Sequence, residues 1–326
     1  MPHTWSRRSF LAMSAGAAAL LATGCGSDEP GAVAEDGSVT VTHVFGETRI
    51  PGPPQRVVSA GLTEQDDLLA LGVVPIAVTE WFGGEPFATW PWSRPRLGPA
   101  QPVVLNLADG IQVDQIAGLK PDLIIAINAG LDADTYARLS GIAPTIAQSG
   151  APFFEPWRDQ ATAIGQSVFK AADMGGLISG LEGRFTQAGK DNPALADKKV
   201  YVVGGTFSKD RAVVTPAGPR TEYLTQMGLV VPDGIGEYVV GGSALVPRDR
   251  MVSVLDEADV LVWTTENDAE TAALLADPTF AELEATRTNR NVLTDRELAG
   301  AIAFGTVPSY GLVADRLPPM LAKVLA

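Results

Sequence analysis

Short apolar runs alternate with longer amphipathic segments along most of this chain, and no other feature restricts its fold as strongly. The run "RVVSAG" leads directly into "LTEQDDLLALG", which has a helix-capping residue at Thr63 and a helix-ending glycine at Gly72. In the first turn of that helix, Glu64, Asp66 and Asp67 would interact favourably with the helix dipole. The next run, "VVPIAVTE", again has the composition of a buried strand. Strands that alternate with helices in this way are typical of an α/β fold with mainly parallel strands.

The alternation occurs in two stretches, which predict two Rossmann-like lobes. Residues 54–154 predict a β-α-β-α-β lobe, and residues 191–326 predict a second lobe that begins at "KKVYVVGG" and ends in a helix. Between them, residues 155–190 predict one connecting helix, because no strand-like run interrupts the segment from Trp157 to Gly189. A helix of that length would extend over roughly 45 Å at about 1.5 Å per residue and would form a stiff connector.

The N-terminal segment has the layout of an export signal. Arg7 and Arg8 precede an apolar run from Phe10 to Gly24, which is shorter than the roughly 18 residues that a membrane-spanning helix needs. The arginine pair resembles the twin-arginine (Tat) export motif, and "ATGC" resembles a lipoprotein cleavage box. Both resemblances predict a signal peptide over residues 1–24.

Cys25 is the single cysteine of the chain, so it cannot form an intramolecular disulfide or a thiolate metal site. Because it completes the cleavage box, we expect it to carry acyl chains that anchor the protein to the membrane. A buried, unmodified cysteine is the alternative. The following stretch, "GSDEPGAVAEDGS", is poor in aliphatic residues, so residues 25–53 predict a lipidated cysteine and a flexible tether.

The net charge of the chain and its scarcity of histidine exclude several classes of function. The net charge of -14 argues against nucleic acid as a partner, because phosphate binding needs a basic surface. His3 lies in the predicted signal and His43 near the start of the mature chain, so no histidine is available within the lobes for a Ser-His-Asp triad. Two histidines are also too few for histidine-based zinc or manganese binding. A carboxylate-based hydrolase and a structural or adhesion lipoprotein remain as alternatives.

Three segments carry a resemblance to a known family: "PQRVVSAGLTEQDDLLALGVVPIAV", "NLADGIQVDQIAGLKPDLIIAINAGLDADTYARLSGIAPTI" and "VPRDRMVSVLDEADVLVW". With the linking helix, they resemble the substrate-binding proteins of ABC importers for ferric siderophores, haem and cobalamin, the class III periplasmic binding proteins. More narrowly, they resemble actinobacterial iron-siderophore-binding lipoproteins. The order and spacing of the segments match over nearly all of residues 40–326.

The resemblance implies two lobes joined by a single long rigid helix, a ligand cleft between the lobes, and delivery to an ABC permease dimer. A ferric siderophore is the expected ligand, haem is the second candidate and cobalamin the third. The resemblance also implies a monomer without catalytic activity, resident cofactor or directly bound metal, anchored by lipid to the outer face of the cytoplasmic membrane. For haem, the axial ligand would be Tyr223, Tyr310 or His43.

Residues that follow the predicted strands are expected to line the cleft, because ligands bind beyond the carboxyl ends of the strands in open α/β sheets. The loop "EWFGGEPFATWPWSRPR" combines aromatic residues with arginines, which suits a large planar or chelated anionic ligand. A hydrophobic cluster that covers the end of the sheet is the alternative for this loop. The expected ligand-binding residues are Ser59, Thr63, Glu64, Trp81, Phe82, Trp90, Trp92, Arg94, Arg96, Asn128, Phe207, Arg211, Arg220, Tyr223, Phe304 and Tyr310.

The resemblance also implies a docking surface. Members of the family carry an acidic residue on each lobe that pairs with arginines of the permease. The matching helix starts of this chain offer Asp132 and Asp134 in the first lobe and Asp249 in the second, where the family commonly has glutamate. For each aspartate, the alternative is a charge that stabilises the helix start.

Overall fold

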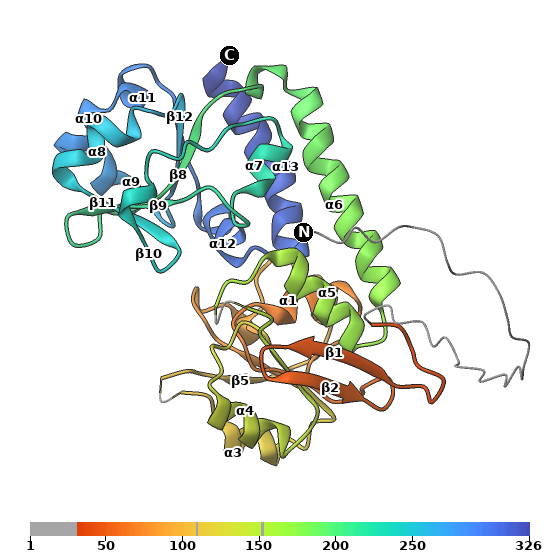
Figure 1. The fold of residues 1–326 in the computed structure, drawn as a ribbon. Helices are drawn as coiled ribbons and strands as arrows, with labels where there is room; N and C mark the ends of the chain where they lie inside the picture. The colour runs from red at the N-terminus through yellow and green to blue at the C-terminus, as the bar shows by residue number, and fades with distance from the viewer. Residues whose placement is uncertain (1–30, 109, 151–152) are drawn as a thin grey trace, which may run out of the picture.

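Each lobe of the molecule is built around its own β-sheet (Figure 1). The computed structural model describes residues 31–326 except 109 and 151–152, so the predicted export signal and Cys25 lie outside the described residues. The first lobe has a five-stranded parallel sheet in the order β5-β4-β3-β6-β7. Its strands are β3 (Val57–Ser59), β4 (Ala77–Thr79), β5 (Val103–Leu105), β6 (Leu123–Ala126) and β7 (Thr145–Ala147). The chain order reverses between β3 and β6, as in doubly wound folds.

Helices separate these strands, which confirms the α/β fold predicted from the alternation. The helices of this lobe are α1 (Glu64–Ala70), α2 (Arg94–Leu97), α3 (Val113–Gly118) and α4 (Ala133–Ser140). Every residue of β3, β4, β6 and β7 is buried. Because both faces of the sheet are covered, its strands read in the sequence as continuous apolar runs.

The second lobe has a six-stranded mixed sheet in the order β10-β11-β9-β8-β12-β13. Its strands are β8 (Val200–Gly204), β9 (Arg211–Thr215), β10 (Val239–Val240), β11 (Ser243–Pro247), β12 (Val260–Thr264) and β13 (Asn291–Leu293). β8, β12 and β13 are parallel, as expected, whereas the pairings of β9, β10 and β11 are antiparallel. Gly241 and Gly242, with φ of 58° and 84°, make the two-residue hairpin turn between β10 and β11.

The tether predicted for residues 25–53 ends earlier than expected. β1 (Val39–His43) and β2 (Gly46–Ile50) form an antiparallel hairpin, and β1 contacts α5. Val39, Val41 and Ile50 are at most 2% exposed. Because buried and exposed residues alternate along "VTVTH", this strand has one face on the core, so the hairpin is part of the folded domain.

The prediction of one helix over residues 155–190 is wrong, because the structure has two helices there. α5 (Trp157–Ser167) packs against the first lobe, and α6 (Ala171–Asp191) runs from the first lobe to the second (Figure 1). Phe169, between them, has a φ of 63°, a left-handed conformation that interrupts a right-handed helix. α6 alone has 21 residues and extends over roughly 31 Å at about 1.5 Å per residue.

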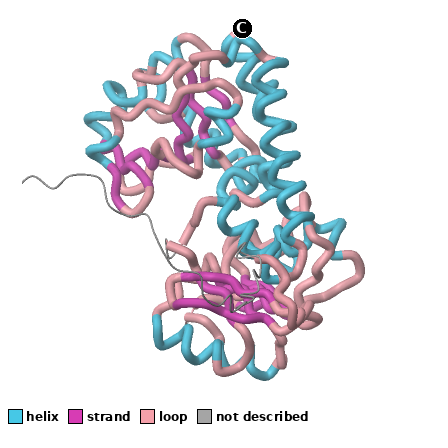
Figure 2. The backbone as a smooth tube through the Cα atoms, turned by 45° about the vertical axis from the view of Figure 1, so that its right-hand side comes forward, coloured by secondary structure: helices cyan, strands magenta, loops and turns pink. Residues whose placement is uncertain are grey.

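One apolar core extends through both lobes on the side where helices connect them. It includes Leu68 of α1, Ile164 of α5, Phe185 of α6 and Leu317 of α13 (Val307–Leu325). α13 contacts α6, and Figure 2 shows the long helices along one side of the molecule, with the two sheets apart from each other. The other helices of the second lobe are α7 (Glu222–Gln226), α8 (Arg248–Leu255), α9 (Asp268–Leu275), α10 (Pro278–Glu282), α11 (Glu284–Arg287) and α12 (Arg296–Phe304). In the described part of the chain, no helix has the length and apolar character needed to cross a membrane.

We predict opposite effects for alanine at two glycines of α6. A Cβ at Gly189 would lie 2.6 Å from the carbonyl oxygen of Met227, so Gly189→Ala forces two backbones apart and should destabilise the protein by about 1–3 kcal/mol. Gly183 is exposed, with nothing within 4 Å of an added Cβ, so Gly183→Ala should stabilise α6 by about 0.5–1 kcal/mol. Urea unfolding of the purified variants measures both changes. Equal shifts in the two variants would contradict the close packing of α6 on the second lobe.

Candidate functional site

A small pocket of about 20 Å³ lies between the two lobes, beyond the carboxyl ends of β3 and β6. The first lobe contributes Thr63, Asn128, Phe154, Glu155, Trp157 and Gln160, and the second contributes Pro219, Arg220, Ile302, Ala303, Phe304, Gly305 and Tyr310. Doubly wound sheets bind ligands at this position, because the connections from the two central strands diverge there. The structure therefore brings together five of the predicted residues, Thr63, Asn128, Arg220, Phe304 and Tyr310.

Among the described residues that line the pocket, Arg220 is the one cation. Its guanidinium carbon lies 5.0 Å from the centroid of the Phe154 ring, in a cation–π contact that joins the lobes. The Tyr310 hydroxyl donates to the Arg220 backbone oxygen at 3.4 Å and helps to hold the loop that carries the arginine. Within the described residues, the Arg220 side chain has no ion pair and no hydrogen bond. Its N–H donors are therefore available to a ligand.

An aromatic wall formed by both lobes adjoins the pocket. Phe154 and Phe304 line the pocket, whereas Trp81 and Phe82 pack beside them without lining it. The ring centroid of Trp81 lies 5.3 Å from that of Phe154 and 5.4 Å from that of Phe304. The Phe82 ring lies 5.6 Å from the Phe304 ring. Trp81 and Phe82 follow β4, whereas Phe304 ends α12, so the wall crosses the boundary between the lobes.

Trp90 and Trp92 support this wall from behind and do not line the pocket. Their rings stack at 4.8 Å with 11° between the planes, and Trp90 is 2% exposed. A Cβ at Gly83 would lie 2.5 Å from the Trp90 ring, and a Cβ at Gly300 would lie 2.6 Å from it. Glycine at both positions therefore lets the Trp90 ring fit between the first lobe and α12.

Hydrogen bonds fix the polar floor of the pocket. Asn128 Nδ2 donates to Thr63 Oγ1 at 3.2 Å, and Thr63 Oγ1 donates to Gln160 Oε1 at 3.2 Å. The Phe154 backbone N–H donates to Asn128 Oδ1 at 2.8 Å. Asn128 thereby positions the ring over which Arg220 lies.

The segment 153–160 contributes strongly to the pocket, although none of its residues is among the expected ligand-binding residues. It supplies Phe154, Glu155, Trp157 and Gln160. The Glu155 carboxylate accepts hydrogen bonds from the Gly150 N–H at 2.8 Å and from the Ser149 hydroxyl at 3.1 Å, and burial raises its pKa. The aromatic pair in "PFFEPW" comes shortly after β7, so its place after a strand could have identified it.

The acidic residues of α1 are buried and are not solvated charges at a helix start. Glu64, Asp66 and Asp67 are fully buried, and burial raises the pKa of Glu64 to about 7 and that of Asp67 to about 7. Glu64 Oε1 accepts from the Asn128 backbone N–H at 2.7 Å, so Glu64 supports the pocket floor without lining the pocket. Their burial comes from the helices packed over α1, which local sequence does not reveal.

Asp66 and Asp67 join α1 to the start of α13. Asp66 Oδ2 accepts from Trp92 Nε1 at 2.7 Å and from Thr306 Oγ1 at 2.8 Å. Asp67 Oδ1 accepts from the Val307 backbone N–H at 3.0 Å. The first N–H groups of a helix lack partners within it and carry the positive end of the helix dipole, so carboxylates are favourable acceptors there.

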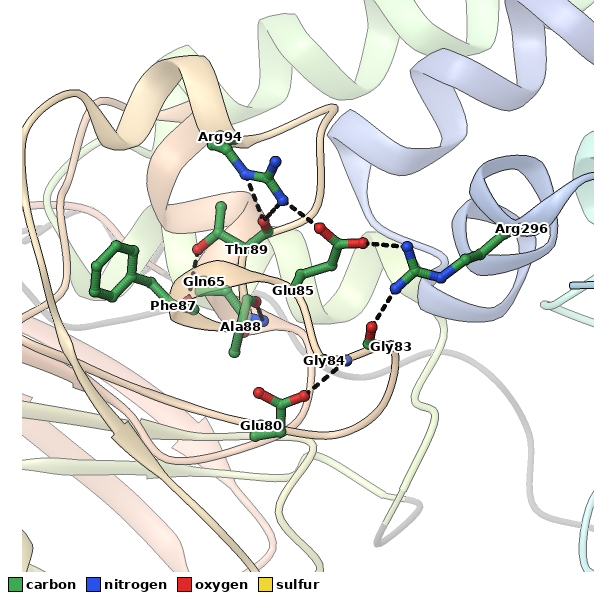
Figure 3. A network of polar contacts seen from close by, with 10 residues as sticks. All are labelled: Gln65, Glu80, Gly83, Gly84, Glu85, Phe87, Ala88, Thr89, Arg94 and Arg296. Carbon is green, nitrogen blue, oxygen red and sulfur yellow. Dashed lines mark hydrogen bonds and ion pairs between the residues drawn. The ribbon is translucent and has the colours of Figure 1, made fainter. Parts of the chain in front are cut away.

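Ion pairs also cross the boundary between the lobes. Figure 3 shows the Glu85 carboxylate between Arg94 of its own lobe and Arg296 of α12, with 2.7 Å between Arg296 Nη1 and Glu85 Oε1. Arg296 also donates to the Gly83 carbonyl, and Arg94 donates to the Thr89 carbonyl at 3.1 Å. Arg94 is thus engaged within the protein and does not line the pocket.

Several other predicted residues lie away from the pocket. Ser59 is fully buried, and Arg96 lines a separate groove. Phe207 lines another cavity, where the Arg248 guanidinium lies 5.0 Å from its ring centroid. Arg211 is exposed at the start of β9. Ser59 is the last residue of β3, Arg96 lies within α2, and Arg211 is the first residue of β9.

The residues considered as haem ligands are in unfavourable places for that role. Tyr310 lines the pocket, but burial raises its pKa to about 12. Tyr223 is buried beside Tyr310, with ring centroids 5.2 Å apart, and burial raises its pKa as well. His43 lies on β1, with Nε2 at 2.9 Å from Thr48 Oγ1, and does not line the pocket. Raised pKa values oppose the deprotonation that an iron-bound phenolate requires.

The three aspartates considered for docking lie on the surface at helix starts. Asp132 Oδ1 accepts from the Thr135 N–H at 2.7 Å, which caps α4 and lowers the pKa of Asp132. Asp134 in the first turn of α4 and Asp249 in the first turn of α8 are exposed. Each lobe therefore presents at least one exposed carboxylate at a helix start.

The raised pKa values of the buried carboxyls predict a pH-dependent stability. A carboxyl whose pKa is higher in the folded state binds its proton more tightly when folded, so its stabilising contribution is complete at low pH and is lost as the pH rises through about 7. The free energy of unfolding should therefore fall from about pH 5 to about pH 7, by up to about 1.4 kcal/mol per pH unit for each titrating carboxyl. Urea unfolding at several pH values in this window measures the slope of the free energy of unfolding against pH.

Asp67→Asn tests the origin of that slope. Asparagine keeps an acceptor for the Val307 N–H but cannot titrate, so the slope should be smaller than in the wild type. Asp191→Asn makes the same change at an exposed position of α6 and should keep the wild-type slope. A wild-type slope in Asp67→Asn would contradict the role assigned to this carboxyl.

Known proteins resemble the chain in both sequence and structure. Residues 57–298 match the family model described as periplasmic binding protein. The crystal structure of a periplasmic solute binding protein from Mycobacterium smegmatis str. MC2 155 is 62% identical and has a TM-score of 0.86, covering 90% of this chain and 100% of that chain.

Two curated relatives are more distant. The "Probable siderophore-binding lipoprotein YfiY" of Bacillus subtilis (strain 168) is 28% identical over 221 residues, which cover 66% of this chain and 65% of that protein. The Fe(3+) dicitrate-binding periplasmic protein FecB of Escherichia coli (strain K12) is 29% identical over 197 residues, which cover 60% of this chain and 63% of that protein. Given the family match over residues 57–298 and the similarity to the Mycobacterium smegmatis protein, this chain belongs to the periplasmic binding protein family.

Proposed function

We propose that this protein captures a ferric siderophore in the pocket between its lobes and delivers it to an ABC permease dimer. The observation that carries the proposal is the Arg220 guanidinium, which lies over Phe154 at the pocket and has no ion pair among the described residues. A free cation beside an aromatic wall suits a chelate that presents oxygen atoms and apolar surface. The names of YfiY and FecB, which refer to a siderophore and to ferric dicitrate, support an iron chelate as the ligand.

Iron would enter as cargo within the chelate, so this function needs no resident cofactor and no covalent step. The acidic residues in and near the pocket support that reading over a carboxylate-based hydrolase, because Glu155 is the one carboxylate among the described residues that line the pocket. Asp66 and Asp67 accept hydrogen bonds from Thr306 and Val307, and Glu64 accepts one from the Asn128 backbone. These carboxylates hold parts of the protein together and do not face each other across the pocket.

The proposal includes an export route and a lipid anchor. Residues 1–24 would direct Tat export, and Cys25 would carry acyl chains that hold a monomer on the outer face of the cytoplasmic membrane. Because β1 begins at Val39, only a short segment would separate Cys25 from the folded domain. The pocket would therefore stay close to the permease.

Asp132 and Asp249 would pair with basic residues of the permease. Asparagine at both positions should lower iron uptake by about 10-fold through loss of charge pairing, and should leave siderophore affinity unchanged because neither residue lines the pocket. Uptake of radioactive iron by cells that carry the importer measures the first effect, and equilibrium dialysis measures the second. Asp191→Asn is the control. Wild-type uptake by the double variant would contradict the docking role.

Titration of the purified full-length protein with a panel of ligands tests the proposed function. Trp81 belongs to the aromatic wall and Trp90 supports it, so binding should quench tryptophan fluorescence. We expect saturable quenching by one class of ferric siderophore and none by free ferric ion or zinc. A response to haemin or cobalamin alone would replace the proposed ligand, and no response to any compound would contradict a chelate receptor.

Two arginine variants serve as a matched pair in this titration. Arg220→Ala should weaken siderophore binding by about 1–3 kcal/mol, because the chelate loses a charged donor. Arg94→Ala removes the same side chain from an ion pair with Glu85, away from the pocket, and should leave the affinity unchanged. Equal losses in the two variants would contradict the role of Arg220.

A further inference from the structure

Two charged side chains line the pocket in the part of the chain that the structure describes, Arg220 and Glu155. Glu155 accepts hydrogen bonds from the Ser149 N–H, the Ser149 hydroxyl and the Gly150 N–H, as expected of an ionised carboxylate. The charges of Arg220 and Glu155 are opposite. The lining of the pocket is therefore close to neutral.

Three other arginines near the pocket form ion pairs with three glutamates, so these six charges cancel only in sum. Glu85 pairs with both Arg94 and Arg296 (Figure 3), and its carboxylate side chain is only 8% exposed. Arg158 pairs with one glutamate of α6 and one of α7. In this structure each of these three guanidinium groups is already engaged by a protein carboxylate.

The remaining surroundings of the pocket disfavour a ligand with several negative charges. Phe154 and Phe304 line the pocket with aromatic surface, which offers no partner to an anion that has lost its hydration. The whole chain carries a net charge of -14, which repels anions over longer distances. A chelate with little net charge avoids both effects.

We infer that the pocket takes a ferric trihydroxamate or a similar siderophore of near-zero net charge, and that it discriminates against multiply negative chelates such as ferric tricatecholates. This inference rests on the proposed function. Three hydroxamate groups balance the charge of ferric iron, whereas three catecholates leave a strongly negative chelate. The neutral chelate still presents oxygen acceptors to Arg220, and its organic shell packs on the aromatic wall.

Equilibrium dialysis of the full-length protein against two radio-iron chelates tests the inference, with ferrichrome as the neutral trihydroxamate and ferric enterobactin as the anionic tricatecholate. We expect ferrichrome to bind more tightly by on the order of 100-fold. Tighter binding of ferric enterobactin, or of anionic ferric citrate, would overturn the inference and leave the proposed function in place. Failure of every ferric siderophore to bind would instead overturn the proposed function.

Two variants test whether the preference for ferrichrome over ferric enterobactin depends on the charge of the pocket lining. Glu155→Gln removes the lining carboxylate but keeps an acceptor for the Gly150 N–H. Pro219→Lys adds a cation at an exposed position of the second-lobe wall, and it remains informative if Glu155→Gln fails to fold. Each variant should narrow the affinity gap between the two chelates by about 10-fold.

Glu47→Gln is the matched control, because it makes the same chemical change on an exposed residue of β2. It should keep the wild-type gap between ferrichrome and ferric enterobactin. A wild-type gap in both pocket variants would overturn the assignment of charge selectivity to the pocket lining.

Discussion

The carboxylates of Asp66 and Asp67 hold the two lobes together at the start of α13. They accept hydrogen bonds from the Thr306 hydroxyl and the Val307 backbone N–H, at the helix end where the dipole is positive. Because both acids are buried, loss of either partner would leave an unpaired polar group in the interior, which costs more than a surface contact contributes. α13 in turn packs beside α6 and within the core common to both lobes. The position of Arg220 over Phe154, and with it the pocket, depends on this junction.

Contacts of two different strengths cross the boundary between the lobes. The junction at α13 is buried and continuous with the apolar core, whereas the ion pair between Arg296 and Glu85 has a half-exposed guanidinium. Glu85 would keep Arg94 as a partner if Arg296 moved away, so this pair can separate without leaving a buried carboxylate unpaired. Entry of a ligand therefore has to separate weak contacts near the pocket, while the junction and the shared core restrict the lobes to small movements. The pocket has only about 20 Å³ of space in this structure, so a siderophore can enter only when these contacts separate and the lobes move apart.

Local sequence patterns predict the strands, and the loops that follow them, because these depend on residues close together in the chain. β3 and β6 are buried on both faces and therefore read as apolar runs, and Arg220 could be placed near the pocket because it follows β9. Arg94 carries the same side chain as Arg220, but it pairs with Glu85, which also contacts Arg296 of the second lobe. Local sequence does not reveal this packing of one lobe on the other. The break at Phe169 is equally hidden, because neither glycine nor proline marks it and it arises where α6 turns back on α5.

The position of iron in the loaded protein tests most directly whether the cargo lies between the lobes. Crystals grown with a bound ferric siderophore allow an anomalous difference map at the iron absorption edge, which locates the metal without reference to any variant. We expect one iron peak within the pocket, beside Arg220 and Asn128. A peak in the separate groove lined by Trp92, Arg184 and Asp315 would contradict capture between the lobes.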